Sequence, residues 1–295
     1  MRNLNLCFVF ILSTSLMFLG GCATSRTAGW NQAEKASSLD PKESKALQQE
    51  AKKNWDKRDD KEKLSAALAA YEKLIKSDPN DYASLAFLSR GYYLLADGHT
   101  DNMEEKKRLW EMGVGFGERA MATNQAFKEK MLANGGKVEE ALDVLTKDQI
   151  DGIYWTAVNL GKWGKNSGIA TVLKYKSRIK MMINRVGELD KNYFFGAFDR
   201  YWGAYYAIAP GFAGGDIKKS LESFEKSVKT EKNYLGTYVL VAELYATKKG
   251  DKELFKEKLN YVLKAKTDVV PAIAPENVIE QRKAKKLLAD MDNLF

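Results

Sequence analysis

The sequence predicts an all-α protein, a solenoid or bundle of helical hairpins that follows an apolar N-terminal segment. Only five prolines occur in 295 residues, and the long intervals between them are rich in Ala, Leu, Lys and Glu, a composition typical of helices. Small and aromatic residues also recur in these intervals at helical spacing. We expect a segment that is removed at residues 1–21, a tether at 22–39 and one all-helical domain at 40–295.

The N-terminal segment has the pattern of a lipoprotein signal peptide. Arg2 carries the positive charge, the apolar stretch from Leu4 to Leu19 is shorter than the ~20 residues needed to span a bilayer, and Leu19-Gly20-Gly21 leads into Cys22. The pattern predicts cleavage before Cys22 and its modification with diacylglycerol and a further acyl chain such as palmitate. Several chains make anchoring durable, whereas one alone binds only marginally. The alternatives are an ordinary secretory signal with an incidental cysteine and a buried hydrophobic segment.

Composition limits the remaining classes. Removal of residues 1–21 would leave Cys22 as the one cysteine, so no disulfide framework is expected. The net charge of +8 comes from lysines mixed with acids, as at residues 57–63, and not from a basic stripe. We therefore expect solvated helix surfaces, with attraction to anionic headgroups as the alternative, and no nucleic-acid partner. Ala23 stands where Asp would hold a lipoprotein at the inner membrane of many Gram-negative bacteria, so the outer membrane, facing the periplasm, is the expected location.

The first helix is expected to begin at Asp40, which can cap free amides while Pro41 takes the first helical position. Beyond it, residues 67–79 match the second-helix half of a tetratricopeptide repeat, and residues 85–92 match the first-helix half of the next unit. The matching residues are Ala67-x3-Tyr71-x2-Leu74-x4-Pro79 and Leu85-x2-Leu88-Ser89-x2-Tyr92, followed by looser matches at Gly113-x3-Gly117-x2-Ala120, Ile179-x3-Ile183-x2-Val186, Ser220-x3-Phe224-x2-Ser227, Tyr238-x2-Val241-Ala242-x2-Tyr245 and Phe255-x3-Leu259-x2-Val262. The prediction is a degenerate tetratricopeptide-like solenoid, with a generic amphipathic bundle as the alternative.

Two insertions are expected to interrupt the repeats, at residues 97–109 and 124–150, the second with a turn at Asn134-Gly135-Gly136. His99 lies in the first of them. Because it is the only histidine, we expect neither a three-ligand zinc site nor a Ser-His-Asp relay. Residues 161–167 do not have the spacing of a phosphate loop. We therefore predict no enzyme, no metal and no cofactor.

The segment from Tyr193 to Asp216 holds the densest information. Aromatic residues cover several faces of its expected helix, which should therefore be wholly buried or line a cavity. Its end has the sequence Pro210-Gly211-Phe212-Ala213-Gly214-Gly215-Asp216. We expect Pro210 and Gly211 to stop the helix, Gly214 and Gly215 to permit a tight backbone path, and Asp216 to cap the next helix at Ile217.

This segment resembles the signature of the TRAP-transporter-associated tetratricopeptide lipoproteins, the TatT-like T component family. Members carry an aromatic helix with an Arg in it and a Pro-Gly-x-x-Gly-Gly-Asp loop, and residues 153–163 resemble the family's other marked helix. The resemblance implies an all-helical protomer, a homotrimer, and an apolar channel or cavity through each protomer. It also implies a periplasmic substrate-binding protein of a tripartite ATP-independent periplasmic transporter as partner, and a small organic acid or a more hydrophobic molecule as ligand.

We expect aromatic side chains to form the ligand passage and Arg200 to meet a ligand carboxylate. The aromatic residues are Tyr154, Trp155, Tyr201, Trp202, Tyr205 and Tyr206. In the alternative reading these aromatics are core, and Arg200 pairs with Asp199 or with an acid from another helix. Two other functions remain open, a tetratricopeptide scaffold lipoprotein of envelope assembly with no ligand channel, and a periplasmic hydrolase, for which no nucleophile and base are found.

Overall fold

Helices and short helical turns make up the fold of this protein, and the prediction of an all-α fold is confirmed. The structure is a computed structural model that describes residues 25–31 and 36–295, and no strand occurs among them. The predicted lipobox and Cys22 lie outside the described residues. Within the described ranges, no helix has both the length and the apolar character needed to cross a membrane.

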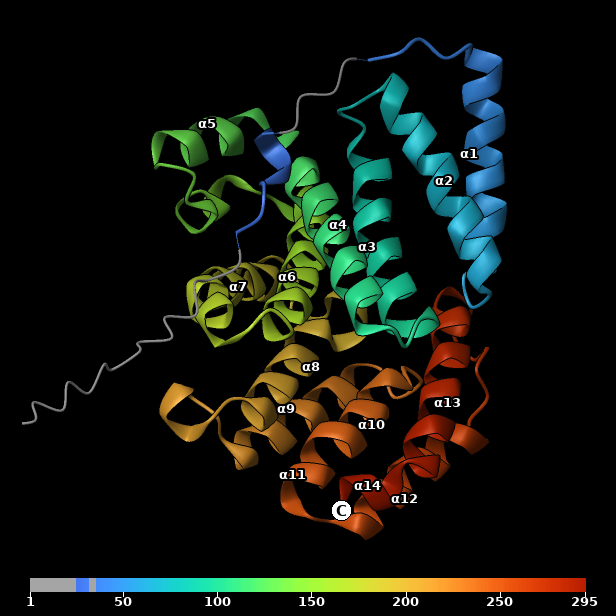
Figure 1. Ribbon diagram of the computed structural model, residues 1–295, viewed down its shortest axis with the longest axis vertical. Helices are drawn as coiled ribbons and strands as arrows, with labels where there is room; N and C mark the ends of the chain where they lie inside the picture. The colour runs from blue at the N-terminus through green and yellow to red at the C-terminus, as the bar shows by residue number, and fades with distance from the viewer. Residues whose placement is uncertain (1–24, 32–35) are drawn as a thin grey trace, which may run out of the picture.

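The N-terminal half is a series of helices that pack on one another in chain order (Figure 1). The helices are α1 (Pro41–Trp55), α2 (Lys61–Ser77), α3 (Tyr82–His99), α4 (Met103–Ala122), α5 (Gln125–Ala133), α6 (Ile150–Lys165) and α7 (Ile169–Leu189). Asp40, Asp60 and Asp81 precede the first three, and each accepts hydrogen bonds from amides of the first turn. The predicted start of the first helix at Asp40 and Pro41 is therefore confirmed.

The C-terminal half turns back toward the beginning of the chain. Its helices are α8 (Tyr193–Ile208), α9 (Ile217–Thr230), α10 (Gly236–Leu240), the π-helix η6 (Val241–Ala246), α11 (Thr247–Lys249), α12 (Lys252–Lys264), α13 (Ala274–Ala289) and α14 (Met291–Leu294). α8 pairs with α9 and α12 pairs with α13, while α13 also contacts α3. This contact brings the end of the chain to its beginning, as Figure 1 shows for the red and teal helices.

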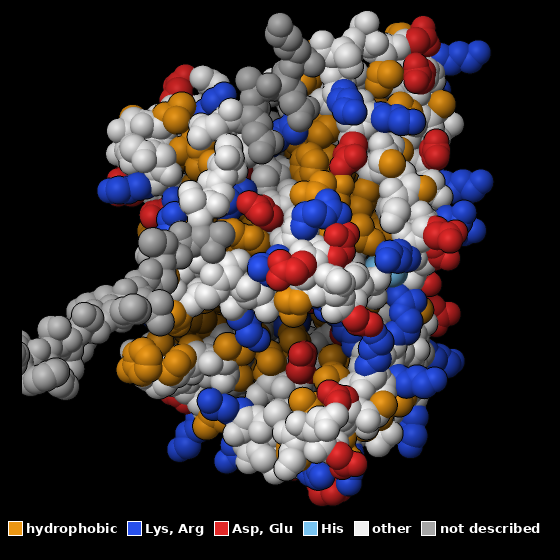
Figure 2. All heavy atoms as spheres, in the orientation of Figure 1, with side chains coloured by type: hydrophobic (Ala, Val, Ile, Leu, Met, Phe, Trp, Pro, Cys, Tyr) orange, Lys and Arg blue, Asp and Glu red, His pale blue; other side chains and the backbone are white. Residues whose placement is uncertain are grey.

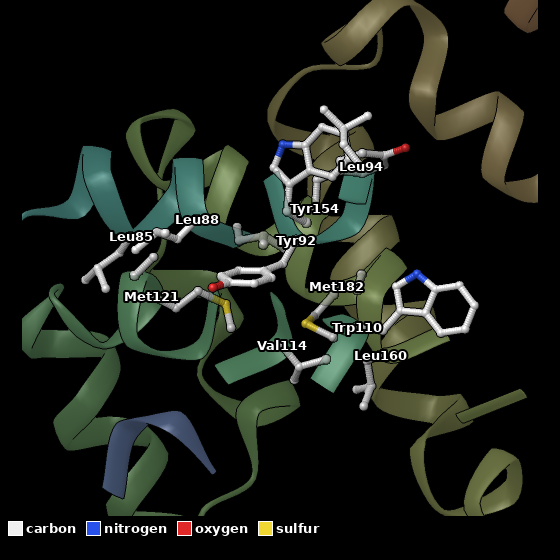
Figure 3. Packing of buried hydrophobic residues seen from close by; sticks show 14 of the residues in the cluster. Leu85, Leu88, Tyr92, Leu94, Trp110, Val114, Met121, Tyr154, Leu160 and Met182 are labelled. Atoms are coloured by element: carbon white, nitrogen blue, oxygen red, sulfur yellow. The ribbon is translucent and has the colours of Figure 1, made fainter. Parts of the chain in front are cut away.

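Two hydrophobic clusters stabilise the fold. The larger runs from α1 to α8 and includes Leu85, Trp110 and Met182, which Figure 3 shows packed between α3, α4, α6 and α7. The smaller lies in the C-terminal part, around Phe255 and Leu259 of α12. Most of the repeat-like positions predicted from the sequence are buried in these clusters. Because burial of apolar surface is the main stabilising contribution to folding, the helical spacing seen in the sequence reflects this packing.

The predicted insertion at residues 97–109 is wrong. α3 continues to His99 and α4 begins at Met103, so an ordinary short turn joins them, with Asn102 as the cap of α4. Gly98, within the predicted insertion, serves close packing, since a Cβ there would lie 2.8 Å from Ile279 of α13. The second predicted insertion, at 124–150, does separate α4 from α6 and consists of α5 and three short 3₁₀ turns.

The described part of the expected tether lies against the body. Arg26 forms an ion pair of 2.7 Å with Glu118 of α4, and both side chains are buried. The Gly29 amide, at the start of the 3₁₀ turn η1 (Gly29–Asn31), donates to the other oxygen of Glu118 at 2.7 Å. A Cβ at Gly29 would lie 2.1 Å from the Gly115 oxygen. Residues 26–29 are therefore held on α4 and do not stand away from it.

Candidate functional site

The aromatic residues predicted for the passage fall into two groups. Tyr154 and Trp155 of α6 contact Phe194 at the start of α8, with ring centroids 6.1 Å and 5.0 Å apart. Tyr201, Trp202, Tyr205 and Tyr206 pack against one another further along α8, with centroids 5.4 to 6.4 Å apart. Among the described residues no ring contact joins the two groups. The sequence prediction therefore combined two separate aromatic groups into one site.

α8 begins with a left-handed turn. Phe194 and Phe195 have φ angles of 43° and 58°, and Gly196 follows with 77°. A non-glycine residue in this region costs about 1–2 kcal/mol, so two in succession persist only where the surroundings hold them. At Gly196 a side chain would also meet the Ser227 carbonyl of α9 at 3.0 Å.

Arg200 holds this turn. Its Nη1 donates to the Phe195 carbonyl at 2.8 Å and its Nη2 to the Phe194 carbonyl at 3.0 Å. The guanidinium lies 4.0 Å from the centroid of the Tyr234 ring, and the residue is only 5% exposed. No ion pair joins Arg200 to Asp199 or to another acid in the described part of the chain. Its partners are thus backbone carbonyls, the Ser227 hydroxyl at 3.5 Å and an aromatic face, which differs from the acid pairing considered in the sequence alternative.

A hollow of about 490 Å³ opens beside the left-handed turn. It is lined by Asp190, Asn192, Tyr193, Phe194, Phe195, Thr230 and Glu231. The hollow is wide and open to solvent, whereas small-molecule sites usually enclose most of their ligand. Phe194 is part of the wall of the hollow and also contacts Tyr154 and Trp155 on the α6 side. Figure 2 shows a further depression between the two halves of the molecule, with hydrophobic side chains in its depth.

Tyrosines from separate elements converge behind Phe194. Tyr93 of α3 lies 5.5 Å from Trp155, and Tyr234 lies 5.8 Å from Phe194, measured between ring centroids. Burial raises the pKa of both hydroxyls well above the usual value. Across residues 25–31 and 36–295, no hydrogen-bond partner is found for the hydroxyls of Tyr93, Tyr154 and Tyr234. The sequence prediction missed Tyr93 and Tyr234, because neither belongs to a marked helix.

Charged side chains lie at one end of these tyrosines. Asp97 of α3 binds Lys162 of α6 at 2.6 Å and also binds Lys283 of α13. Lys283 in turn binds Glu280 at 2.9 Å. Burial alone would raise the pKa of Asp97, but Lys162 and Lys283 outweigh it and hold this pKa well below the usual range. Asp97 is therefore ionised and joins three helices.

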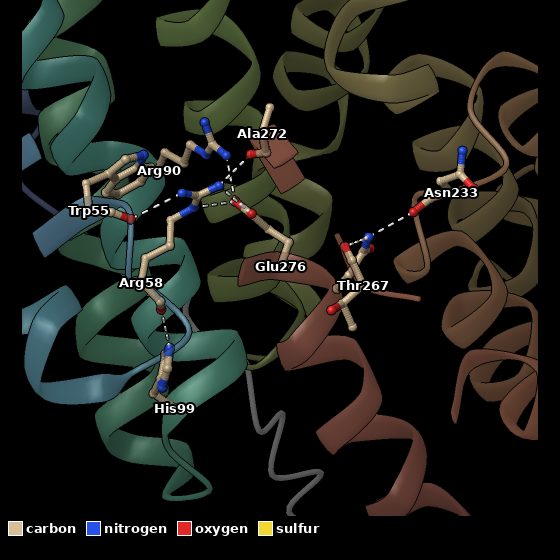
Figure 4. A network of polar contacts seen from close by, with 9 residues as sticks. Trp55, Arg58, Arg90, His99, Asn233, Thr267, Ala272 and Glu276 are labelled. Carbon is tan, nitrogen blue, oxygen red and sulfur yellow. Dashed lines mark hydrogen bonds and ion pairs between the residues drawn. The ribbon is translucent and has the colours of Figure 1, made fainter. Parts of the chain in front are cut away.

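A second polar cluster ties α13 to the N-terminal half (Figure 4). Arg58 donates to both oxygens of Glu276, at 2.9 Å and 2.6 Å, and to the Ala272 carbonyl at 2.6 Å. Arg90 adds a bond of 2.6 Å to Glu276. Burial would raise the pKa of Glu276, yet the charge of Arg90 and the bonds from Arg58 keep it below its usual value. We call Arg58, Arg90 and Glu276 the α13 clasp.

His99 has a structural environment in the same region. Its Nε2 lies 2.9 Å from the Arg58 carbonyl, as Figure 4 shows. Burial lowers the pKa of the imidazole, so the ring is neutral near pH 7. The described residues contain no group of three or more His, Cys, Asp and Glu side chains arranged to hold a metal.

The predicted loop at the end of α8 is closely packed. Tyr205 donates its hydroxyl to the Ala213 carbonyl at 2.6 Å, and the Gly215 amide donates to the Pro210 carbonyl at 3.0 Å. A Cβ on Gly215 would lie 1.8 Å from the Ala209 oxygen, and Gly214 has a φ of 94°. Asp216 accepts bonds from the amides of Lys218 and Lys219 and so caps α9. The short 3₁₀ turn η5 (Gly211–Ala213) follows Pro210 and ends at Gly214.

Helices packed as a bundle, with α13 against α3, define the class, an all-helical protein. A family model described as TRAP transporter T-component matches residues 60–295. The chain belongs to this family, whose members are accessory components of TRAP transport, and the resemblance found in the sequence is confirmed. A search of curated proteins found no match.

Proposed function

We propose that this protein is a periplasm-facing accessory lipoprotein of a TRAP uptake system, and that it holds a small organic or hydrophobic ligand among the aromatic side chains of Phe194, Tyr93, Tyr154 and Tyr234, which we call the candidate cleft. Membership of the T-component family supports the link to TRAP transport. The acyl anchor would be on Cys22 and the membrane would be the outer one. The molecule would act as a homotrimer and dock a periplasmic substrate-binding protein. It would bind and transfer its ligand without turnover.

The observation that carries the ligand site is the set of unpaired polar groups among aromatic rings. Binding sites are mostly apolar, with a few polar groups that fix the orientation of the ligand. Around Phe194, the hydroxyls of Tyr93, Tyr154 and Tyr234 have this character. These hydroxyls are not among the buried side-chain atoms that lack a partner, and Tyr93 and Tyr234 are only half-buried, so a ligand or water could reach and bind them.

The two arginines have different roles in this proposal. Arg200 shapes the wall by fixing the carbonyls of Phe194 and Phe195. Arg90 lies 4.8 Å from the Phe194 ring and 5.5 Å from the Trp155 ring, and its Nε has no partner among the described residues. Arg90 is therefore our candidate for the contact with a ligand carboxylate. Tyr201, Trp202, Tyr205 and Tyr206 would form a second apolar section along α8.

Native mass spectrometry of the purified protein tests the ligand site. A small molecule retained from the host should add its mass, and the double variant Tyr93→Phe and Tyr234→Phe should lower the occupied fraction at least fivefold. Tyr261→Phe, on the surface of α12, is the matched control and should keep the occupancy of the parent. Equal occupancy in all three proteins, or a spectrum with the unliganded mass alone, would contradict the proposal.

Affinity purification from the native host tests the partner. The tagged chain should retain an extracytoplasmic substrate-binding protein, and gel filtration with light scattering should give the mass of a trimer. Retention of envelope-assembly proteins in place of a substrate-binding protein would favour the scaffold alternative.

A further inference from the structure

The most exposed large apolar side chain of the described residues is Phe212, at the tip of the loop between α8 and α9. It is 95% exposed. The loop that carries it is well fixed, because Ala213 accepts bonds from Tyr205 of α8, at 2.6 Å, and from Lys176 of α7, at 3.1 Å. A single exposed apolar residue is ordinary, but several that form a continuous patch mark a contact surface. The ligand cleft makes no use of this side chain.

An apolar strip on α7 continues this surface. Ile169 and Leu173 are 72% and 64% exposed, and their spacing of four residues places them on one face of the helix. Lys176, which binds the loop at Ala213, is on the same face. Ile208, at the end of α8, is also exposed. Figure 2 shows hydrophobic side chains gathered where Figure 1 places this loop and α7.

The surroundings of the strip are basic. Residues 161–187 contain seven Lys and Arg residues and no Asp or Glu. Lys165 and Lys174 are exposed beside Ile169 and Leu173, and Lys218 and Lys219 are exposed just after the loop. Exposed apolar side chains ringed by lysines are the combination that binds the interface of an anionic bilayer. Each basic residue near such a surface adds to the attraction.

The start of the described chain lies on the same helix. Trp30 of η1 is near Arg178 of α7, with 6.0 Å from the guanidinium to the ring centroid, and Arg26 is fixed on Glu118. Cys22 precedes Arg26 by four residues, which span at most about 14 Å. An acyl anchor on Cys22, which belongs to the proposed function, would hold this side of the protein close to the membrane. The exposed apolar side chains and lysines around Phe212 are present whether or not Cys22 is acylated.

We propose that Phe212, together with Ile169 and Leu173, forms a membrane-contacting surface whose partner is an anionic phospholipid bilayer. The Phe212 ring enters the interfacial region while Lys165, Lys174, Lys218 and Lys219 meet the headgroups. The Pro-Gly-x-x-Gly-Gly-Asp loop thereby fixes the orientation of the protein at the membrane.

Environment-sensitive fluorescence tests this surface. The chain from residue 23 onward keeps every contact described above and contains no cysteine. Phe212→Cys labelled with a nitrobenzoxadiazole dye should shift its emission to the blue with vesicles of phosphatidylethanolamine and phosphatidylglycerol. Val269→Cys, exposed between α12 and α13, is the matched control and should show no shift. If the dye at position 212 keeps the emission maximum that it has in water while the protein is bound to vesicles, the proposal is overturned.

Vesicle sedimentation of unlabelled variants gives the second measurement. Phe212→Asp should weaken binding to anionic vesicles about tenfold or more, given the 1.5–3 kcal/mol expected from burying one phenylalanine, and Val269→Asp should leave it unchanged. The proposal is overturned if Phe212→Asp and the parent bind the vesicles equally. It is also overturned if the parent self-associates without vesicles and Phe212→Asp abolishes that self-association. The chain from residue 23 onward lacks Cys22 and carries no acyl group. If Cys22 proved not to be acylated in cells, the proposed lipoprotein function would be contradicted, but vesicle binding through Phe212 would still stand.

Discussion

At the scale of single residues, Arg200 shows how one side chain can serve a site that it need not touch. Two consecutive phenylalanines take a left-handed conformation that their side chains disfavour. Arg200 binds both of their carbonyls and is itself nearly inaccessible. The guanidinium has a planar fork of donors, so lysine could not reproduce the two bonds. Arg200 therefore sets the position of Phe194, which is the wall of the candidate cleft.

We predict that Arg200→Ala destabilises the protein by about 2–4 kcal/mol, because buried carbonyls lose their donors and the turn is released. Arg200→Lys should recover less than half of this loss. Urea unfolding followed by circular dichroism measures the free energies. Asp199→Asn is the neighbouring control and should change stability little, since burial already raises the pKa of Asp199 and disfavours its charge. Loss of ligand binding with unchanged unfolding would instead assign Arg200 to the ligand.

At the scale of elements, glycines set the distance between α4 and α6. A Cβ at Gly117 would lie 2.1 Å from the Thr156 oxygen and 2.8 Å from the Ser89 oxygen, and one at Gly113 would lie 2.5 Å from Asn159. Asn159 and Ser89 are fully buried and connect α6 to α3, through a bond of 3.0 Å from Asn159 to the Ser89 carbonyl. The small residues at helical spacing therefore permit a three-helix contact.

Gly117→Ala tests this contact. We expect a loss of about 1–3 kcal/mol, because the added methyl group must displace α6 or its polar side chains. Gly161→Ala is the matched control on α6, where a Cβ would meet no atom within 4 Å. It should stabilise the protein by roughly 0.5–1 kcal/mol, since alanine favours the helix. Thermal unfolding of the two variants should therefore shift in opposite directions, and a common direction would refute the packing argument.

The elements also show what a sequence can predict. Caps such as Asp40 and Asp216 act within a few residues of themselves, so the starts of α1 and α9 were predictable. The role of Gly98 depends on Ile279, far along the chain, so the sequence near residue 98 did not show that α3 continues through it. Nothing in the sequence distinguishes the left-handed Phe194 and Phe195 from helical residues. Tyr93 and Tyr234 join the site only because α3 and the turn before α10 meet in the fold.

At the scale of the whole molecule, the α13 clasp closes the chain. Arg58 and Arg90 come from the N-terminal half, and Glu276 comes from the C-terminal half. Both Arg58 and Glu276 are nearly inaccessible. Because removal of one partner leaves a buried charge uncompensated, the clasp controls how firmly α13 is held on the N-terminal half.

Glu276→Gln should lower the free energy of unfolding by about 3–5 kcal/mol, the range for breaking a buried ion pair. Lys286→Gln removes the exposed pair with Asp101, also between α13 and the N-terminal half, and should change stability by less than about 1 kcal/mol. Guanidinium unfolding of the two variants gives the comparison. Similar values for both would show that the clasp is no more than a surface contact.

Asp97 makes closure of the molecule depend on pH. Its pKa in the folded protein lies well below the value of about 3.9 in an unfolded chain. The unfolded state therefore binds the proton more tightly, so the stability that Asp97 contributes is fully present above about pH 4 and is lost as the pH falls toward the folded pKa. The pKa values of Lys162 and Lys283 are raised by Asp97 in spite of burial, so both remain charged throughout this range.

The prediction concerns the difference between the parent and Asp97→Asn. We expect the variant to be less stable by about 1–2 kcal/mol at pH 7, the scale of hydrogen bonds to charged groups, and the difference to fall by about 1.4 kcal/mol per pH unit below about pH 3.9. Urea unfolding of both proteins between pH 7 and pH 3 measures it, and carboxylates common to the two cancel. A difference that stays constant over this range would mean that Asp97 joins α3, α6 and α13 by shape and not by its charge.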